Sequence, residues 1–279
     1  MKGILMKTCI FTVLFFVVNT IVLAQTFDFH DIPTDNPVIG IGFDKPFFSD
    51  KITSSSSSGV YHLRGNIPIT PTLNLLLEIP YTVASYEQDY WFGKIKFDNN
   101  GLGNLVAAFQ IKPESTATRM SFYTIGMVLP TGQKDAAPFG VLTNMYLFQQ
   151  YLPNSMGFYF NYAYHNINPE GFAFGLELGP NFIIPTKGTN SELELFAHYG
   201  MQGGYNIHDF FFNIELLGIA TLTSDVRDFS DRFSHSLTFG TQWKISAVTP
   251  ELYYRIFVEE DTRKIIDGVL GLGISVSLK

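Results

Sequence analysis

Along most of this chain apolar and polar residues alternate, and this pattern limits the fold more than any other feature. Within Gly101–Gly132, Leu105, Ala107, Phe109 and Ile111 fall on one face, and Asn104, Ala108, Gln110 and Lys112 fall on the other. A period of two is the period of a β-strand, because successive side chains point to opposite faces of the pleat. After a polar break at Pro113–Thr116 the alternation resumes, with Met120, Phe122 and Val128 on one face. The stretch predicts a β-hairpin with an apolar face that includes these three residues.

The same alternation recurs toward the C-terminus, and it predicts about 12 strands, with 14 as the alternative. Ala84–Asn100 reads as a long polar and aromatic loop, and Val141–Tyr151 reads as a weak strand. No stretch keeps a period near 3.6, so no helical domain is expected. Long and short connections alternate correctly only if a strand near Val38–Phe47 is added and a second counting error lies between Thr131 and Asn190.

The composition decides where the apolar faces point. Charged residues make up only 15% of the chain and aromatic residues another 15%, whereas soluble domains carry about 25% charged residues. A soluble β-sandwich or lipocalin-like barrel would show the same alternation, but the number of strands and the scarcity of charge on their apolar faces argue against it. The predicted fold class is therefore all-β, a single antiparallel transmembrane β-barrel with its apolar face toward lipid.

The N-terminus has the features of a secretory signal. Lys2 and Lys7 precede the apolar run Ile10–Val18, and Val22–Ala24 provides a small-residue cleavage site. The run is short of the roughly 20 residues that a spanning helix needs, so a cleaved signal peptide at 1–24 is expected rather than an anchor. Cys9 is the only cysteine of the chain, and the mature protein would have neither disulfides nor thiolate metal sites.

The next segment, residues 25–59, is predicted to be irregular, because it contains three prolines and the serine run Ser54–Ser58. It would form either a periplasmic tail or a plug inside the barrel. The barrel domain is predicted to span residues 60–279. The whole chain has a net charge of −7, which argues against nucleic-acid binding because phosphate contacts need basic residues.

Three short motifs occur in a familiar order. They are Glu78-Ile79-Pro80-Tyr81, Gly101-Leu102-Gly103-Asn104-Leu105 and Leu129-Pro130-Thr131-Gly132. In this order the chain from about Val60 to Lys279 resembles the outer-membrane family of the MetA-pathway of phenol degradation, which is similar to FadL-type transporters of hydrophobic compounds. Asn104 stands where that family usually has Asp. The resemblance implies a passive outer-membrane channel or transporter for small hydrophobic molecules.

Known catalytic signatures are missing from the sequence. It contains no phosphate loop, no HExxH, no Cys/His cluster and no GxSxG elbow, so we expect no enzyme activity, no catalytic residues, no cofactor and no metal. Ser234-His235-Ser236 leaves an outer-membrane lipid hydrolase as the least favoured alternative. A nucleophile must lie within hydrogen-bond reach of its base, and alternation points His235 away from both serines.

Titratable residues on the predicted inner face are candidates to line a transport path. The predicted lumen residues are Arg64, Glu78, Glu177, Glu192, Glu194, His198, Glu215, Lys244, Glu251 and Arg255. Buried charges must be paired, so each could instead brace the wall. We expect Glu192, Glu194, His198 and Glu215 to form one polar patch.

These observations predict a bacterial outer-membrane protein, exported through a cleaved signal peptide. Its expected partners are the lipid bilayer, the barrel-assembly machinery and small hydrophobic molecules. A non-transporting barrel that acts as a surface scaffold or adhesion protein remains the main alternative.

Overall fold

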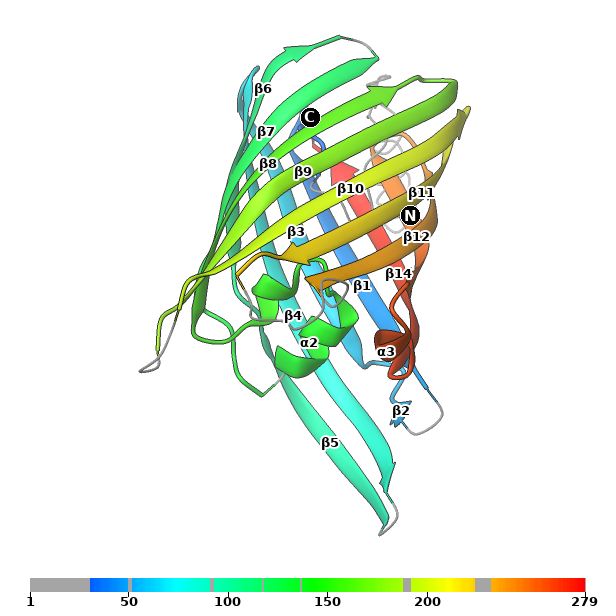
Figure 1. Ribbon diagram of the computed structural model, residues 1–279. Coiled ribbons are helices and arrows are strands. Elements are labelled where there is room, and N and C mark those ends of the chain that lie inside the picture. The colour runs from blue at the N-terminus through cyan, green and yellow to red at the C-terminus, as the bar shows by residue number, and fades with distance from the viewer. Residues whose placement is uncertain are drawn as a thin grey trace, which may run out of the picture.

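The computed structural model describes residues 31–49, 52–90, 93–116, 118–135, 137–187, 192–223 and 232–278. The predicted signal peptide lies outside these residues. Within them, twelve antiparallel strands close into a barrel, and two further strands extend it at one end (Figure 1). The barrel strands are β1 (Val38–Phe48), β3 (Gly59–Thr70), β4 (Leu73–Tyr90), β6 (Val106–Ser115), β7 (Arg119–Val128), β8 (Ser155–Ile167), β9 (Gly171–Pro185), β10 (Glu194–Ile207), β11 (Phe210–Thr221), β12 (Phe233–Trp243), β13 (Val248–Phe257) and β14 (Ile266–Ser277).

Two pairings close the sheet. β1 pairs with β14 over its whole length, from Val38 opposite Ser277 to Phe48 opposite Ile266. The first part of β4 pairs with β6, from Leu73 opposite Ile111 to Glu78 opposite Val106. Every barrel strand therefore has a partner on each side, as a bilayer requires of spanning strands.

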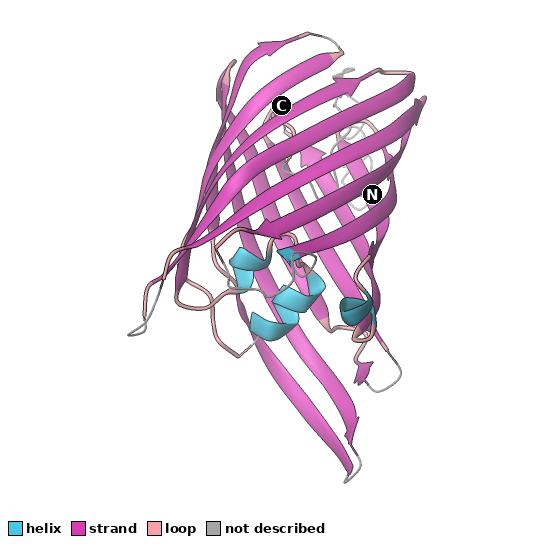
Figure 2. Cartoon of the chain, in the orientation of Figure 1, coloured by secondary structure: helices cyan, strands magenta, loops and turns pink. Residues whose placement is uncertain are grey.

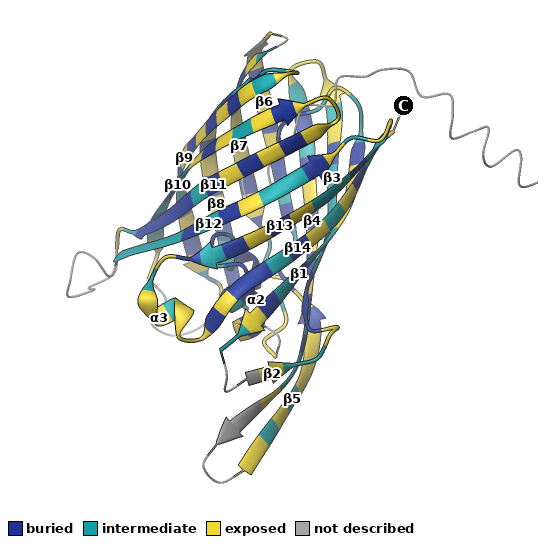
Figure 3. Ribbon diagram, turned by 90° about the vertical axis from the view of Figure 1, so that its right-hand side faces the viewer, coloured by how far each residue is buried: buried dark blue, intermediate teal, exposed yellow. Residues whose placement is uncertain are grey.

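Alternation along the strands separates an inner from an outer face, as the sequence predicts (Figure 3). The outer face exposes large apolar side chains such as Phe109, Phe160 and Ile274, which are 42–49% exposed. Their neighbours on the inner face, such as Gln110 and Asn161, are fully buried. No helix in the described part of the chain is long and apolar enough to cross a membrane.

The predicted N-terminal boundary of the barrel is wrong. β1 lies inside the segment 25–59 that was expected to be irregular, at the position where the count of connections required a missing strand. The barrel therefore begins at Val38 instead of Val60. Pro46 is accommodated in β1 because it lies near the end of the strand, beside the irregularity at Phe47 and Phe48.

The second counting error is the expected strand at Val141–Tyr151. This segment forms the helix α2 (Ala137–Thr143) and the 3-10 helix η1 (Phe148–Tyr151), coloured cyan in Figure 2. β7 and β8 pair directly with each other, so no strand edge is left for the residues between them. With this correction, long connections all lie at one end of the barrel, the long-loop end, and tight connections lie at the other, the short-turn end.

The expected loop Ala84–Asn100 is also regular structure. β4 continues past the barrel and pairs with β5 (Gly93–Leu102), while β2 (Ile52–Ser54) pairs with the other edge of β4. This three-stranded extension, the arm, projects from the long-loop end beside a short helix, α3 (Glu260–Arg263) (Figure 1). Most residues of β5 are exposed, so the polar composition of the segment favoured a loop.

The predicted orientation of β7 is wrong. Met120, Phe122 and Val128 point into the barrel and are at most 6% exposed, whereas Ile125 and Met127 face outward. The register explains this, because Val128 lies opposite Val106, an inward residue of β6. The inner wall tolerates apolar residues here because another part of the chain packs against them inside the barrel.

We expect single cysteines at Phe109, Phe160, Phe212, Phe239 and Ile274 to react with a lipid-phase label. Cysteines at Gln110, Asn161, Glu215 and Thr238 should remain unlabelled, because these residues are buried on the inner face. The assay needs a Cys9→Ser background only if residue 9 is retained. Equal labelling of both sets would contradict the assignment of the two faces.

Candidate functional site

The inside of the barrel is lined by polar side chains that are almost completely buried. Buried polar groups need hydrogen-bond partners, because leaving one unpaired costs about 1–3 kcal/mol. In this barrel many of the partners come from the chain itself, which enters the lumen from both ends. The candidate site is this filled lumen.

A charged network lies on the wall near the long-loop end. His62 of β3 contacts two carboxylates, with Nδ1 2.8 Å from Glu78 Oε1 and Nε2 3.3 Å from Asp44 Oδ2. The Arg64 guanidinium donates to the same Glu78 oxygen at 3.3 Å. Strands β1, β3 and β4 are neighbours in the sheet, and their register brings these inward residues to a similar depth.

β13 completes the network from across β14. Tyr253 donates its hydroxyl hydrogen to Asp44 Oδ1, and the Arg255 guanidinium lies 4.0 Å from Asp44 Oδ2. Arg255 is 2% exposed and also donates to the backbone oxygen of Thr143 at 3.0 Å. The wall network therefore reaches the segment that joins β7 and β8.

That segment, residues 129–154, folds into the barrel and is called the inward loop. Its helical turns lie within the long-loop end of the barrel (Figure 1). Two of its side chains bind wall carboxylates. Tyr146 donates to Glu177 at 2.8 Å, and Gln150 donates to Glu78 at 3.0 Å. The loop thus bridges carboxylates on β4 and β9.

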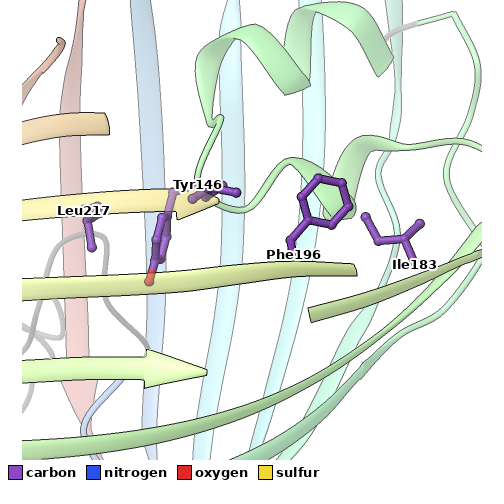
Figure 4. Close-up of a cluster of buried hydrophobic side chains, with 5 residues drawn as sticks. Tyr146, Ile183, Phe196 and Leu217 are labelled. Carbon is purple, nitrogen blue, oxygen red and sulfur yellow. The ribbon is translucent and has the colours of Figure 1, made fainter. Parts of the chain in front are cut away.

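An apolar cluster holds the same loop against β9–β11. Tyr146 packs with wall residues that point inward, among them Ile183, Phe196 and Leu217 (Figure 4). Phe148 meets Phe196 edge to face with their ring centroids 5.0 Å apart. Burial of these side chains stabilises the docked loop by roughly 1.5–3 kcal/mol each.

Asn104 clamps the base of the inward loop. Its side-chain amide donates to the backbone oxygens of Gln149 and Leu152 at 2.9 and 2.7 Å, and its oxygen accepts from the Gly132 backbone at 2.7 Å. A Cβ on Gly103 would lie 2.7 Å from the Gln150 oxygen, so glycine is needed for this close approach. The Gly-Leu-Gly-Asn and Leu-Pro-Thr-Gly motifs are therefore parts of one clamp.

A second segment occupies the lumen from the short-turn end. The backbone oxygens of Asp31, Ile32 and Thr34 accept hydrogen bonds from the inward amides of Gln110, Asn66 and Asn74, respectively. Ile32, which is 1% exposed, packs with inward residues of β7 and β8. Those residues are Met120, Phe122, Ala163 and Ile167. The N-terminal segment was expected to form either a periplasmic tail or a plug. Residues 31–37 agree with the plug, because they lie inside the barrel.

Two small cavities lie between the two intruding segments, in the part of the chain that the structure describes. One, of about 20 Å³, is lined by Arg64 and Glu78 with Gln149 and Gln150 of the inward loop. The other, of about 30 Å³, lies beside Arg64 and Glu251. Asp31 lines both. Each has room for little more than a water molecule.

Most of the sequence-predicted lumen residues face the lumen. Within the described chain, six of these candidates do so, together with Glu251. They are Arg64, Glu78, Glu177, His198, Glu215 and Arg255. Lys244 instead follows the end of β12 at a short turn, where its backbone donates to the Asp209 oxygen at 2.8 Å.

The expected patch of Glu192, Glu194, His198 and Glu215 does not form. Glu192 and Glu194 are exposed at the long-loop end, where β10 begins. His198 contacts Asn181 at 2.9 Å, whereas Glu215 accepts from Asn213 at 2.7 Å. Alternation placed all four on the same side of the sheet, but it carries no information on depth along the barrel.

Sequence reasoning missed the residues that hold the lumen closed. Asp44 was assigned to an irregular segment, and Tyr146 and Gln150 were assigned to a weak strand. The clearest available signal was the motif around Asn104, a polar residue between two glycine-rich turns. Its function depends on the inward loop, which alternation could not reveal.

The arm is connected to the inward loop by aromatic contacts. Tyr86 of β4 stacks on Phe97 of β5 with centroids 4.8 Å apart. The ring centroid of Phe139 in α2 lies 6.0 Å from that of Tyr86 and 5.6 Å from that of Phe48 at the end of β1. A displacement of the arm would therefore change the packing around Phe139 of the inward loop.

The Ser-His-Ser sequence does not bring its members together. His235 lies between the Tyr199 hydroxyl at 2.7 Å and Glu259 Oε1 at 2.9 Å. Its neighbours Ser234 and Ser236 point to the other face of β12, so this histidine is not placed to activate either hydroxyl.

Comparison with solved structures identifies the architecture. An outer-membrane channel from Pseudomonas putida F1 superimposes with a TM-score of 0.63 at 12% identity, covering 91% of this chain and all of that one. The NanC porin gives 0.54 at 9% identity, covering 86% of this chain and all of that one. The KdgM porin gives a TM-score of 0.50 at 8% identity, covering 87% of this chain and 99% of that one. The fold is that of outer-membrane barrels. No protein-family model and no curated protein matches the sequence.

We expect Asn104→Asp to release the inward loop. The carboxylate cannot donate to the oxygens of Gln149 and Leu152, so the barrel should lose about 2–4 kcal/mol of stability. Limited proteolysis within 129–154 and heat-modifiable migration on gels measure the two effects. Asn99→Asp makes the same change on the exposed arm and should alter neither. Equal behaviour of the two variants would contradict the clamp.

Proposed function

We propose that the protein is a channel of the bacterial outer membrane for small, hydrophobic molecules, in which the inward loop controls passage. The observation that carries the proposal is the lumen itself, which is the interior of a complete barrel and is occupied by two segments of the same chain. Likeness to outer-membrane channel and porin folds supports the location and the general activity.

The contacts of the inward loop support a role in control of passage. Its polar attachments to the wall are individual hydrogen bonds. Tyr146 and Gln150 donate to wall carboxylates, the Thr143 backbone oxygen accepts from Arg255, and Asn104 donates to the base of the loop. Each contributes about 0.5–1.5 kcal/mol net, or up to about 3 kcal/mol when one partner is charged. A loop held by such contacts can leave the lumen without unfolding the barrel, because the strands on both sides of it pair directly.

The lining supports solutes that have an apolar body. An apolar strip runs along the inner wall on β4, β6, β7 and β8 and includes Leu76, Val106, Val128 and Tyr159. The same residues line the cavity beside Arg64 and Glu78. Carboxylates exceed basic side chains around the lumen, which disfavours anionic solutes. The resemblance to the MetA-pathway of phenol degradation family is consistent with this class of solute.

We expect Tyr146→Ala combined with Gln150→Ala to increase channel conductance in planar bilayers. The two substitutions remove the hydrogen bonds from the loop side chains to Glu177 and Glu78. Addition of Ile32→Asp should increase it further, since a carboxylate cannot remain buried against Phe122. Tyr162→Ala with Asn99→Ala removes an aromatic and an amide side chain at exposed positions outside the inward loop and serves as the control. Unchanged conductance in folded, triply substituted protein would contradict the proposed channel.

We expect Val106→Thr to lower uptake of benzylamine relative to glucosamine by roughly fivefold, or about 1 kcal/mol. The substitution keeps the shape of the side chain and adds a hydroxyl to the apolar strip. Both solutes are primary amines, so a change in the ratio of their uptake rates reflects recognition of the apolar ring of benzylamine. Vesicle uptake in the loop-released background measures it, and Val276→Thr on the outer face is the control. An unchanged ratio would remove the apolar strip from solute selection.

The arm supports a second candidate function, that of a surface scaffold or adhesion protein. It projects beyond the barrel and carries exposed charges on β4 and β5, among them Glu87, Lys94 and Lys96. Under this alternative, truncation of the arm would abolish partner binding while conductance of the loop-released channel stayed unchanged.

A further inference from the structure

The outer face of the barrel is hollowed over β9–β12. A groove of about 760 Å³ opens there, lined almost entirely by apolar atoms of outward side chains. Its floor is at Gly203, where a Cβ would meet nothing within 4 Å. The residues around this floor are Phe172, Phe174, Met201, Tyr205, Phe212, Ile214, Leu216 and Phe239. The groove exists because glycine leaves a gap in a surface otherwise covered by large side chains.

The groove has rigid aromatic walls. Phe172 is 77% exposed and meets Tyr205 edge to face, with ring centroids 4.9 Å apart. Such paired rings lose little freedom when a ligand binds, because each ring has only two side-chain torsions. The volume lies within the roughly 300–1,000 Å³ of known small-molecule sites.

Its depth in the membrane follows from the strand positions. Gly203 lies four residues before the end of β10 at Ile207, which is roughly 13 Å along the strand. Phe210 and Trp243 stack at this short-turn end, with centroids 5.4 Å apart, and such aromatic pairs mark the membrane boundary. The groove therefore opens into the hydrocarbon of the leaflet at the short-turn end, which is the periplasmic leaflet.

We propose that this groove is a binding site for one acyl chain of a periplasmic-leaflet phospholipid. The groove is continuous with the apolar band that faces lipid, and it is concave, so a chain lying over Gly203 contacts the floor and the aromatic walls together. A chain on the convex remainder of the barrel contacts protein on one side only. The bound lipid is therefore held more tightly than the surrounding lipid.

The chain offers a matched pair of variants to test the site. Gly203→Leu fills the floor of the groove without a clash, because the space above it is open. Gly65→Leu on β3 makes the same change at another glycine of the outer face that also has nothing within 4 Å, and it lies outside the groove. Both variants should fold, which heat-modifiable migration can verify.

Native mass spectrometry of purified protein with dioleoyl phosphatidylethanolamine measures the occupancy. We expect wild type and Gly65→Leu to retain one lipid at a collision energy at which Gly203→Leu retains none. Equal retention by all three proteins would overturn the proposal. A protein dimer that is lost only in Gly203→Leu, without a retained lipid, would also overturn it and would assign the groove to a second copy of the chain.

Discussion

Closure of the sheet by backbone hydrogen bonds is the constraint on which the remaining structure depends. In hydrocarbon an unpaired strand edge is too costly to persist, so β1 must pair with β14 and β4 must pair with β6. Every residue between two directly paired strands is then excluded from the wall. This is why the apolar segment between β7 and β8 becomes an inward loop, and why β4 needs β5 as a partner where it leaves the barrel.

A closed wall creates a second requirement, because its inner polar groups are removed from bulk water. The barrel satisfies many of them with the inward loop from one end and residues 31–37 from the other. Glu78 illustrates the result, since it accepts from His62, Arg64 and Gln150 together. The same contacts stabilise the barrel and close the lumen, so structural bracing and control of passage are two consequences of one arrangement.

The outer face follows a simpler rule, since lipid accepts any apolar surface. Individual gaps such as that at Gly203 therefore cost little for folding, and they become sites only where large rigid side chains surround them. The inner and outer faces of the barrel thus carry different kinds of candidate site. The inner site is defined by hydrogen bonds and charge, and the outer one is defined by shape.

Alternation, together with the low content of charged residues, determined the fold class. Alternation alone determined the direction of most side chains, including the inward position of residues such as Glu177 and Arg255. It could do so because side-chain direction in a strand is a local property with a period of two. It could not place Glu194 at the rim, turn Met120 inward or fold Tyr146 into the lumen. Those outcomes depend on depth along the barrel, on the register between strands and on contacts between distant segments, which only the closed tertiary structure decided.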